Sequence, residues 1–155
     1  MTDPDNPVVL NDGLRYDPVI QKWDTVEANS KDGFPVMAGS AFPYGSNDIV
    51  FVGGAPDSTY LQAQHLASAV AKATPGINAA QAKSELLRFN NSHRGFSPQI
   101  RIYNTIKKSI SSGGLFQGFC PVTTCAIPYG NGAIVACGEI KPGVRTPDIF
   151  KVFIK

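Results

Sequence analysis

Glu139 and Arg145 are the two residues whose type and spacing offer chemistry. Glu139 follows an apolar run at residues 133–137, where a carboxylate is costly to bury unless it is paired or used. Between the two charges lies Pro142-Gly143, which favours a tight turn, of type II if Gly143 takes a positive φ. Such a turn would bring both side chains to one mouth, where the guanidinium keeps the carboxylate ionised and can bind a substrate carboxylate. An ordinary surface pair at a turn is the other interpretation of these residues.

The elements that must position this pair are short strands around one helical segment. Turn-bounded runs of β-branched and aromatic residues predict strands near residues 14–16, 37–43, 49–52, 100–104, 122–128, 133–137 and 149–154. Residues 58–88 instead combine abundant alanine with apolar residues at helical spacing. Ser58 is the expected N-cap of a first helix, and Thr74-Pro75 is expected to end it and to start a second helix that ends near Arg88. Residues 89–98 are expected to form a loop.

The two β regions repeat each other without gaps. At a shift of 85 residues, Phe34 matches Phe119, Ala41 matches Ala126, Pro43-Tyr44-Gly45 matches Pro128-Tyr129-Gly130, Ile49-Val50 matches Ile134-Val135, and Gly53 matches Gly138. Tyr16 matches Tyr103 at a shift of 87. The helical segment is an insertion within one repeat. Repeats of short strands with shared turns are typical of propellers, whose four-stranded blades cannot bury both faces alone.

The first unit resembles a kelch repeat. It has the spacing of Tyr16 and Trp23 and the doublet Gly53-Gly54 after an apolar strand. Glycines allow a tight turn near the propeller axis, and the aromatic rings pack between blades. The alignment predicts that the second unit has Gly138-Glu139 in place of the doublet and Ile110 in place of the tryptophan.

The segment Gly-Glu-Ile-Lys-Pro-Gly-Val-Arg-Thr at 138–146 resembles the signature of the N-acetylneuraminate epimerases, the sialic acid mutarotases, in their cyclically permuted branch. The similarity also covers the Tyr16 to Trp23 unit and residues 34–37, 49–54, 102–105 and 121–124. It implies mostly β structure, with kelch-type β-propeller blades and a short α-helical insertion at about 58–88. Residues 1–13 would be a leader or linker, and residues 14–155 about two of six blades, a C-terminal portion of the whole propeller.

The resemblance implies interconversion of the α and β anomers of a sialic acid, with Glu139 as proton acceptor and Arg145 as its active-site partner. His93 and Arg94, in a loop that approaches the pocket in the family, are the candidates for substrate binding. No metal and no cofactor are implied, and the family suggests a periplasmic or exported setting. The alternative is a non-enzymatic kelch module that binds a protein or a glycan through its loops.

Length limits this expectation. A six-bladed propeller needs roughly 300 residues at about 50 per blade, whereas the chain has 155. The isolated chain would therefore lack activity unless self-association, for example three chains in one ring, or blades from another chain complete the fold.

Composition excludes other classes of protein. The net charge is +2, from 14 basic and 12 acidic residues without a basic run, so nucleic acid is not an expected partner. Apolar stretches are too short to span a membrane, and the polar start of the chain has no signal peptide. Cys120, Cys125 and Cys137 fit neither a disulfide framework nor a zinc site, and they are expected to pack as small apolar residues, with Cys137 the least exposed. His65 is expected on the solvent face of its helix.

Overall fold

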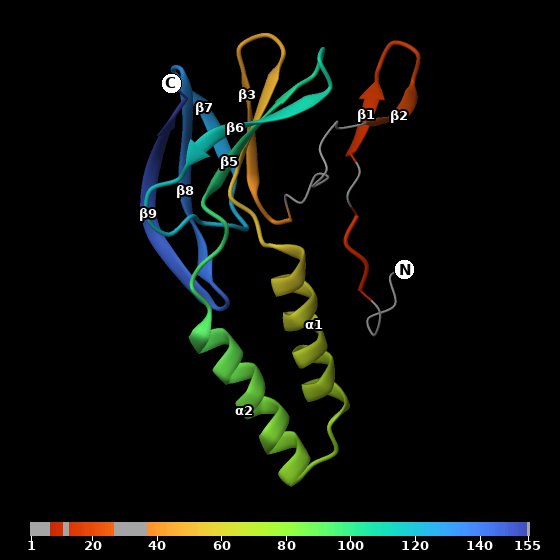
Figure 1. The fold of residues 1–155 in the computed structure, drawn as a ribbon, viewed down its shortest axis with the longest axis vertical. Coiled ribbons are helices and arrows are strands. Elements are labelled where there is room, and N and C mark those ends of the chain that lie inside the picture. Colours follow the sequence, from red (N-terminus) through yellow and green to blue (C-terminus); the bar gives the residue numbers. More distant parts are fainter. Residues whose placement is uncertain (1–6, 11–12, 27–36, 155) are drawn as a thin grey trace.

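The computed structural model describes residues 7–10, 13–26 and 37–154 (Figure 1). The strands are β1 (Gly13–Asp17), β2 (Lys22–Val26), β3 (Ser40–Tyr44), β4 (Asp48–Val52), β5 (Gln99–Asn104), β6 (Ser109–Leu115), β7 (Ala126–Tyr129), β8 (Gly132–Lys141) and β9 (Val144–Phe153). The helices α1 (Asp57–Lys72) and α2 (Ile77–Ser92) lie between β4 and β5. The matched segment 34–36 and most of the expected leader lie outside the described residues.

The strands form three antiparallel sheets that follow one another along the chain. The first sheet is β1-β2, the second is β3-β4-β5-β6, and the third is β7-β8-β9. Figure 1 shows them in this order from right to left, with the helical hairpin extending below. The mostly β fold with one short helical insertion is therefore as predicted, and the second sheet is a complete four-stranded meander.

The register of the strands confirms one part of the repeat. Tyr16 lies opposite Trp23 in the first sheet, and Tyr103 lies opposite Ile110 in the second. Ile110 thus occupies the tryptophan position of the second unit, as the alignment predicts. It follows that β1-β2 corresponds to β5-β6, the two later strands of a blade.

The counterpart of the Gly53-Gly54 doublet in the third sheet differs from the predicted Gly138-Glu139. Gly53 and Gly54 have φ of +71° and +120°, and the residues with similar positive φ in the third sheet are Cys137 at +51° and Gly138 at +120°. The β7-β8 turn is one residue shorter than the β3-β4 turn, which moves the correspondence by one position. The prediction that Gly138-Glu139 replaces the doublet was therefore wrong. Its counterpart is Cys137-Gly138.

Glu139 accordingly corresponds to Ala55. Each of these residues forms an isolated antiparallel bridge with the segment that enters its sheet, Ala55 with Met37 and Glu139 with Val122. The backbone N–H of Ala55 donates to Met37 at 2.8 Å, and that of Glu139 donates to Val122 at 2.9 Å. The second unit thus places a glutamate at a backbone position where the first unit has a buried alanine.

A further repeat joins β5 to β9. In Ser97-Pro98 and in Thr146-Pro147, the hydroxyl accepts a hydrogen bond from the backbone N–H two residues later, at 3.3 Å from Gln99 and at 3.2 Å from Asp148. The residue after each acceptor–donor pair is an isoleucine, Ile100 or Ile149. These two isoleucines therefore hold the same place in successive sheets.

The core lies between the second and third sheets. Its most buried members are Phe42, Val50, Val52 and Ile100 from the second sheet, Ala133, Val135 and Val152 from the third, with Ile154 just beyond β9 and Phe116 and Cys120 from the connecting loop. The rings of Phe116 and Phe150 meet edge to face at 5.1 Å. Alternation along each strand explains this arrangement, because every second residue points toward the neighbouring sheet.

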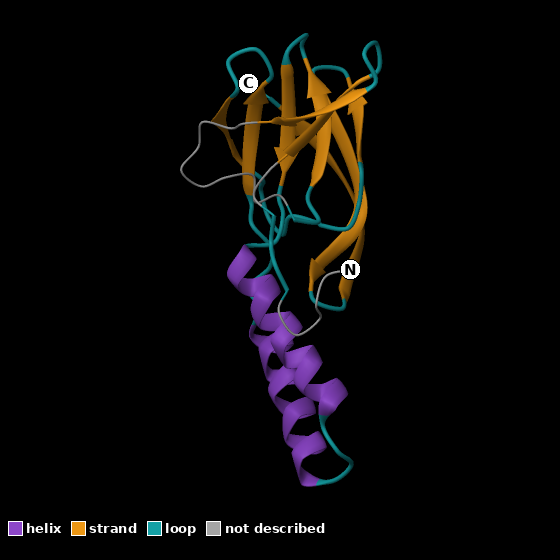
Figure 2. Cartoon of the chain, turned by 90° about the vertical axis from the view of Figure 1, so that its right-hand side faces the viewer, coloured by secondary structure: helices purple, strands orange, loops and turns teal. Residues whose placement is uncertain are grey.

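The helices project from the sheets as a hairpin (Figure 2). Pro56 occupies the N-cap of α1, and Gly76, with φ of +128°, occupies that of α2; neither makes a side-chain capping bond. The expected caps, Ser58 and Thr74-Pro75, were therefore wrong. Proline favours the extended conformation of an N-cap, and the proline-glycine turn delays the second helix by two residues, from Pro75 to Ile77.

The loop expected at 89–98 begins later than predicted. The helix α2 continues to Ser92, whose Oγ donates to the carbonyl of Phe89 at 3.0 Å. His65 is exposed on α1, as predicted. No helix in the described part of the chain has both the length and the apolar character needed to cross a membrane.

Candidate functional site

The candidate site is the tip of the β8-β9 hairpin. Gly143 has a φ of +73°, the positive value that a type II turn requires after proline. Glu139 lies directly opposite Arg145 in the register of the two strands. The turn thus brings the two residues to neighbouring strands at one end of the third sheet, as their spacing predicts.

Each of the two charged side chains is held by its own partner. Glu139 is half-buried, and its Oε1 accepts a hydrogen bond from the backbone N–H of Gly143 at 2.5 Å. Arg145 is exposed, and its Nη2 donates to Oγ1 of Thr123 at 3.1 Å. Among the described residues these two side chains form no ion pair with each other. Both groups remain accessible to a ligand that spans them.

Thr123 belongs to a loop that ties this site to the second sheet. Its φ is +52°, and its backbone N–H donates to the carbonyl of Ala38 at 2.9 Å. Ala38 itself has a φ of +58° and precedes Thr123 by the same 85-residue shift as the predicted repeat. Sequence reasoning did not assign Thr123 a role, although its place in the repeat marks the loop as a fixed backbone position.

His93 and Arg94 lie close to the hairpin but differ in accessibility. The ring of His93 is buried beside Phe89 and Phe96, and its Nδ1 accepts a hydrogen bond from the N–H of Gly95 at 3.1 Å. Burial, and then the nearby charge of Lys141, lower the pKa of His93, so its neutral form is favoured. Arg94 is exposed.

Phe119 joins the loop after α2 to the hairpin. Lys141 places its Nζ 5.3 Å from the centre of the Phe119 ring, a cation–π contact. Gly95, with a φ of +101°, approaches this ring so closely that a Cβ would lie 2.9 Å from it and 3.5 Å from the carbonyl oxygen of Ile140. Three segments distant in sequence therefore meet at the end of the third sheet.

The charge at this end suits an anionic ligand. Lys141 and Arg145 are cationic and Arg94 lies in the adjoining loop, whereas Glu139 supplies a carboxylate near the tip of the hairpin. A carboxylate beside guanidinium groups can move a proton while the cations bind a negatively charged substrate. Among the described residues, no three His, Cys, Asp or Glu side chains gather into a possible metal site.

The cysteines divide by exposure. Cys120 is buried in the core, and burial raises its pKa to about 11. Cys125 and Cys137 are exposed, and all three are free thiols. The prediction that Cys137 is the least exposed was wrong, because its left-handed backbone at the bulge in β8 turns the side chain out of the alternation of the strand.

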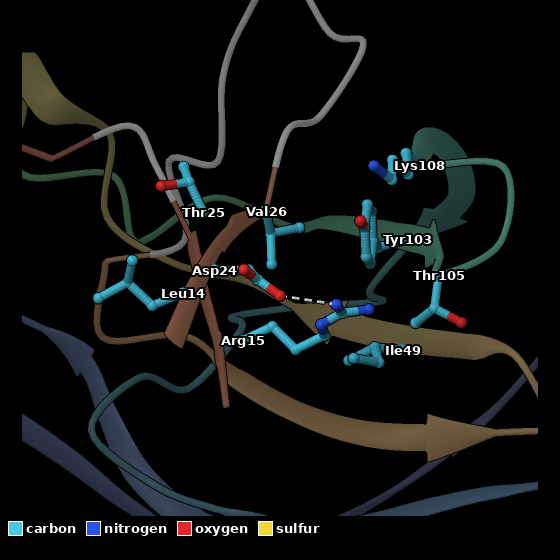
Figure 3. Close-up of a pocket in the computed structure, with 9 residues that line it drawn as sticks. All are labelled: Leu14, Arg15, Asp24, Thr25, Val26, Ile49, Tyr103, Thr105 and Lys108. Atoms are coloured by element: carbon cyan, nitrogen blue, oxygen red, sulfur yellow. Dashed lines mark hydrogen bonds and ion pairs between the residues drawn. The ribbon is translucent and has the colours of Figure 1, made fainter. Parts of the chain in front are cut away.

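Apart from the hairpin tip, a cavity lies between the first and second sheets (Figure 3). It has a volume of about 460 Å³. Arg15 and Asp24 form an ion pair at 2.9 Å on one wall, while Tyr103 and Lys108 line the opposite wall. This gap between sheets has a mixed polar and apolar lining and is incompletely filled, unlike the packed core between the second and third sheets.

Comparison with known proteins identifies the architecture. No family model matches the chain, and no curated protein matches it. Among solved structures, YjhT superposes with a TM-score of 0.71 at 14% sequence identity, over 93% of this chain and 40% of that chain. The chain folds as an arc of propeller-like blades with a short helical insertion. It spans less than half the length of YjhT, and at this identity the likeness shows the fold alone.

Proposed function

We propose that the chain carries the catalytic hairpin of a sialic acid mutarotase, which interconverts the α and β anomers of N-acetylneuraminate. The observation that carries the proposal is the placement of Glu139 opposite Arg145 at the accessible end of the third sheet. The motif around these residues supports the substrate class, and the superposition on YjhT supports the propeller-type framework.

Glu139 is the proposed base. The Gly143 N–H anchors Oε1, which leaves Oε2 to accept the proton of the anomeric hydroxyl. The electrons of that O–H bond form the carbonyl as the bond from the anomeric carbon to the ring oxygen breaks, and the ring oxygen takes up a proton. The open keto form rotates and closes on its other face by the reverse steps. The cycle returns the proton, so one carboxylate suffices.

Arg145 is the proposed ligand of the sugar carboxylate. Its hydrogen bond to Thr123 uses one of the five guanidinium donors and orients the planar group. Arg94, exposed in the adjoining loop, is a proposed second contact. His93 is buried with Nδ1 already engaged, so in this proposal it contributes to substrate binding by holding the loop that presents Arg94.

Anomerisation of freshly released α-N-acetylneuraminate, followed by NMR with and without the protein, tests the proposal. We expect a rate above the spontaneous one, and a loss of about 10²- to 10⁴-fold in Glu139→Gln. Arg145→Lys should raise KM, since a point charge replaces a bidentate fork. Glu85→Gln, on the exposed surface of α2, is the matched control and should keep the rate. A folded protein that leaves the spontaneous rate unchanged, or a Glu139→Gln variant as fast as the parent, would refute the assignment.

The cavity between the first and second sheets favours the alternative function, a non-enzymatic module that binds a glycan or protein. Arg15, Tyr103 and Lys108 offer it a mixed polar and aromatic lining. In that case Lys108→Ala would weaken binding of immobilised glycans or proteins, whereas Glu139→Gln would leave it unchanged. The two variants therefore separate the two functions.

A further inference from the structure

The outer face of the third sheet is apolar and uncovered. Alternation along the strands places Ile127, Tyr129, Ile149 and Phe153 on the face that points away from the second sheet, and each is at least half exposed. Lys151 lies among them, with its Nζ 4.5 Å from the centre of the Tyr129 ring and 4.8 Å from that of Phe153. Contiguous exposed apolar surface of this kind marks an interaction site.

The second sheet shows what covers such a face. Ile127 holds the place that Phe42 holds in the second sheet, and Ile149 holds the place of Ile100. Phe42 and Ile100 are only 2% and 6% exposed, because the third sheet packs against them. Ile149, in contrast, is 72% exposed. The same face is thus buried by a neighbouring sheet in the second sheet and exposed in the third.

The outer face of the first sheet is open in the complementary direction. Arg15 and Asp24 point toward the cavity beside the second sheet, so alternation puts Tyr16 and Trp23 on the opposite face (Figure 3). The rings of Tyr16 and Trp23 lie 5.1 Å apart, and Trp23 is 66% exposed. Tyr103, the counterpart of Tyr16 in the second sheet, is buried on the side that faces the first sheet.

We propose that two copies of the chain associate head to tail, so that the outer face of each third sheet packs against the outer face of the partner's first sheet. This contact repeats the order in which successive sheets already pack within one chain. The contact occurs twice, related by a twofold axis, so the assembly closes into a ring of six sheets. A single type of contact thereby covers both open apolar faces.

The extent of the arc favours two copies over three. One copy superposes on 40% of the YjhT chain, so two copies account for most of such a chain and three would exceed it. Within the described residues, the first sheet has two strands fewer than the four-stranded second sheet, and the third sheet has one fewer. Two copies therefore cover less than the whole length of the YjhT chain, and the uncovered part is about as large as the strands that the first and third sheets lack. The inference depends on the fold and not on the proposed mutarotase activity.

Light scattering over a concentration series tests the association of the 155-residue chain. We expect a mass that rises to twice the 16.5 kDa of one chain. The single tryptophan reports the contact directly, because Trp23 leaves water on association and its emission shifts to shorter wavelength over the same concentrations. The mass of a single chain at all concentrations, the mass of a trimer, or a dimer whose tryptophan emission does not shift would overturn the proposal.

Charge substitutions define which faces meet. Ile149→Lys and Trp23→Lys should each yield single chains, and Ile127→Lys should repeat the result of Ile149→Lys; circular dichroism checks that each variant is folded. The control, Ile106→Lys, alters a residue that is 73% exposed in the β5-β6 turn and should still dimerise. An equal mixture of Ile149→Lys and Trp23→Lys chains should dimerise again, since one intact face of each kind remains. Failure of that mixture to associate, or a dimer that survives Trp23→Lys, would refute a head-to-tail contact.

Discussion

Truncation of one isoleucine in each of two successive sheets measures how much stability the covering sheet provides. Ile100 and Ile149 follow the same Ser/Thr-Pro hydroxyl turn in β5 and β9, so their backbone settings match. Their exposures of 6% and 72% differ because only Ile100 has a neighbouring sheet above it. Ile100→Ala and Ile149→Ala therefore remove the same atoms from two environments that differ in cover.

The expected free energies of unfolding follow from the buried area. Removing three carbons costs about 0.8 kcal/mol each when they are buried, and the residual cavity raises the loss for Ile100→Ala into the range of about 2–5 kcal/mol. With little more than a quarter of its side chain buried, Ile149→Ala should lose about 0.7 kcal/mol and leave no cavity. In urea titrations the first variant should shift its midpoint by about 1 M or more, and the second by a few tenths.

The measurement requires single chains, so it is made at a concentration where light scattering gives the mass of one chain. Far-UV circular dichroism follows the unfolding, and an unchanged slope of the transition shows that the two variants unfold alike. Equal shifts for the two variants would refute the assignment of Ile149 to an open face. They would also remove the basis of the head-to-tail contact.

Three other predictions test local features. Burial and a nearby lysine lower the pKa of His93, so as the pH falls the unfolded chain binds a proton at this residue before the folded chain does. The free energy of unfolding should therefore decrease as the pH drops below 6.5. In urea titrations at a series of pH values, this decrease should be smaller in His93→Asn than in the parent. Gly53→Ala should lower the free energy of unfolding by about 2 kcal/mol or more, because φ is +71° and the new Cβ would meet the Cys120 thiol. Cys137→Ala changes the corresponding position, which already carries a Cβ, and should lower it by less than about 1 kcal/mol in the same assay. Titration with a thiol reagent at neutral pH should count two cysteines in the folded chain and the third, Cys120, only after unfolding; three reactive thiols in the folded chain would contradict its burial.

The sequence predicted those parts of the fold that depend on local pattern. Alternation and turn residues located most of the strands, and the repeat predicted that Ile110 holds the tryptophan position of the second unit, where the register places it opposite Tyr103. The alignment of the glycine doublet failed, because a difference of one residue in turn length is invisible to an ungapped repeat. Helix caps failed for a similar reason, since proline and glycine overrode the hydroxyl residues expected there.

Side-chain partners at the candidate site depended on tertiary contacts. The spacing of Glu139 and Arg145 predicted a shared hairpin, which the register shows. It did not predict that Glu139 accepts from Gly143 or that Arg145 donates to Thr123, because Thr123 reaches the site through a loop 22 residues away in sequence. The burial of His93 likewise follows from two phenylalanines and a lysine brought together by the fold.

The correspondence of Ala55 and Glu139 shows how one backbone position carries two uses. Both residues follow a pair of left-handed residues, and both bridge to the segment that enters their sheet. After Ala55 the chain leaves the sheet into the helical hairpin, so this position is buried and a small side chain suits it. After Glu139 the chain turns at Pro142-Gly143, and the carboxylate lies at the end of the sheet, where it accepts a hydrogen bond from the Gly143 N–H. The repeat therefore fixes the backbone, and the length of the following connection decides whether the side chain at that position is buried, as in Ala55, or lies half-buried at the end of the sheet, as in Glu139.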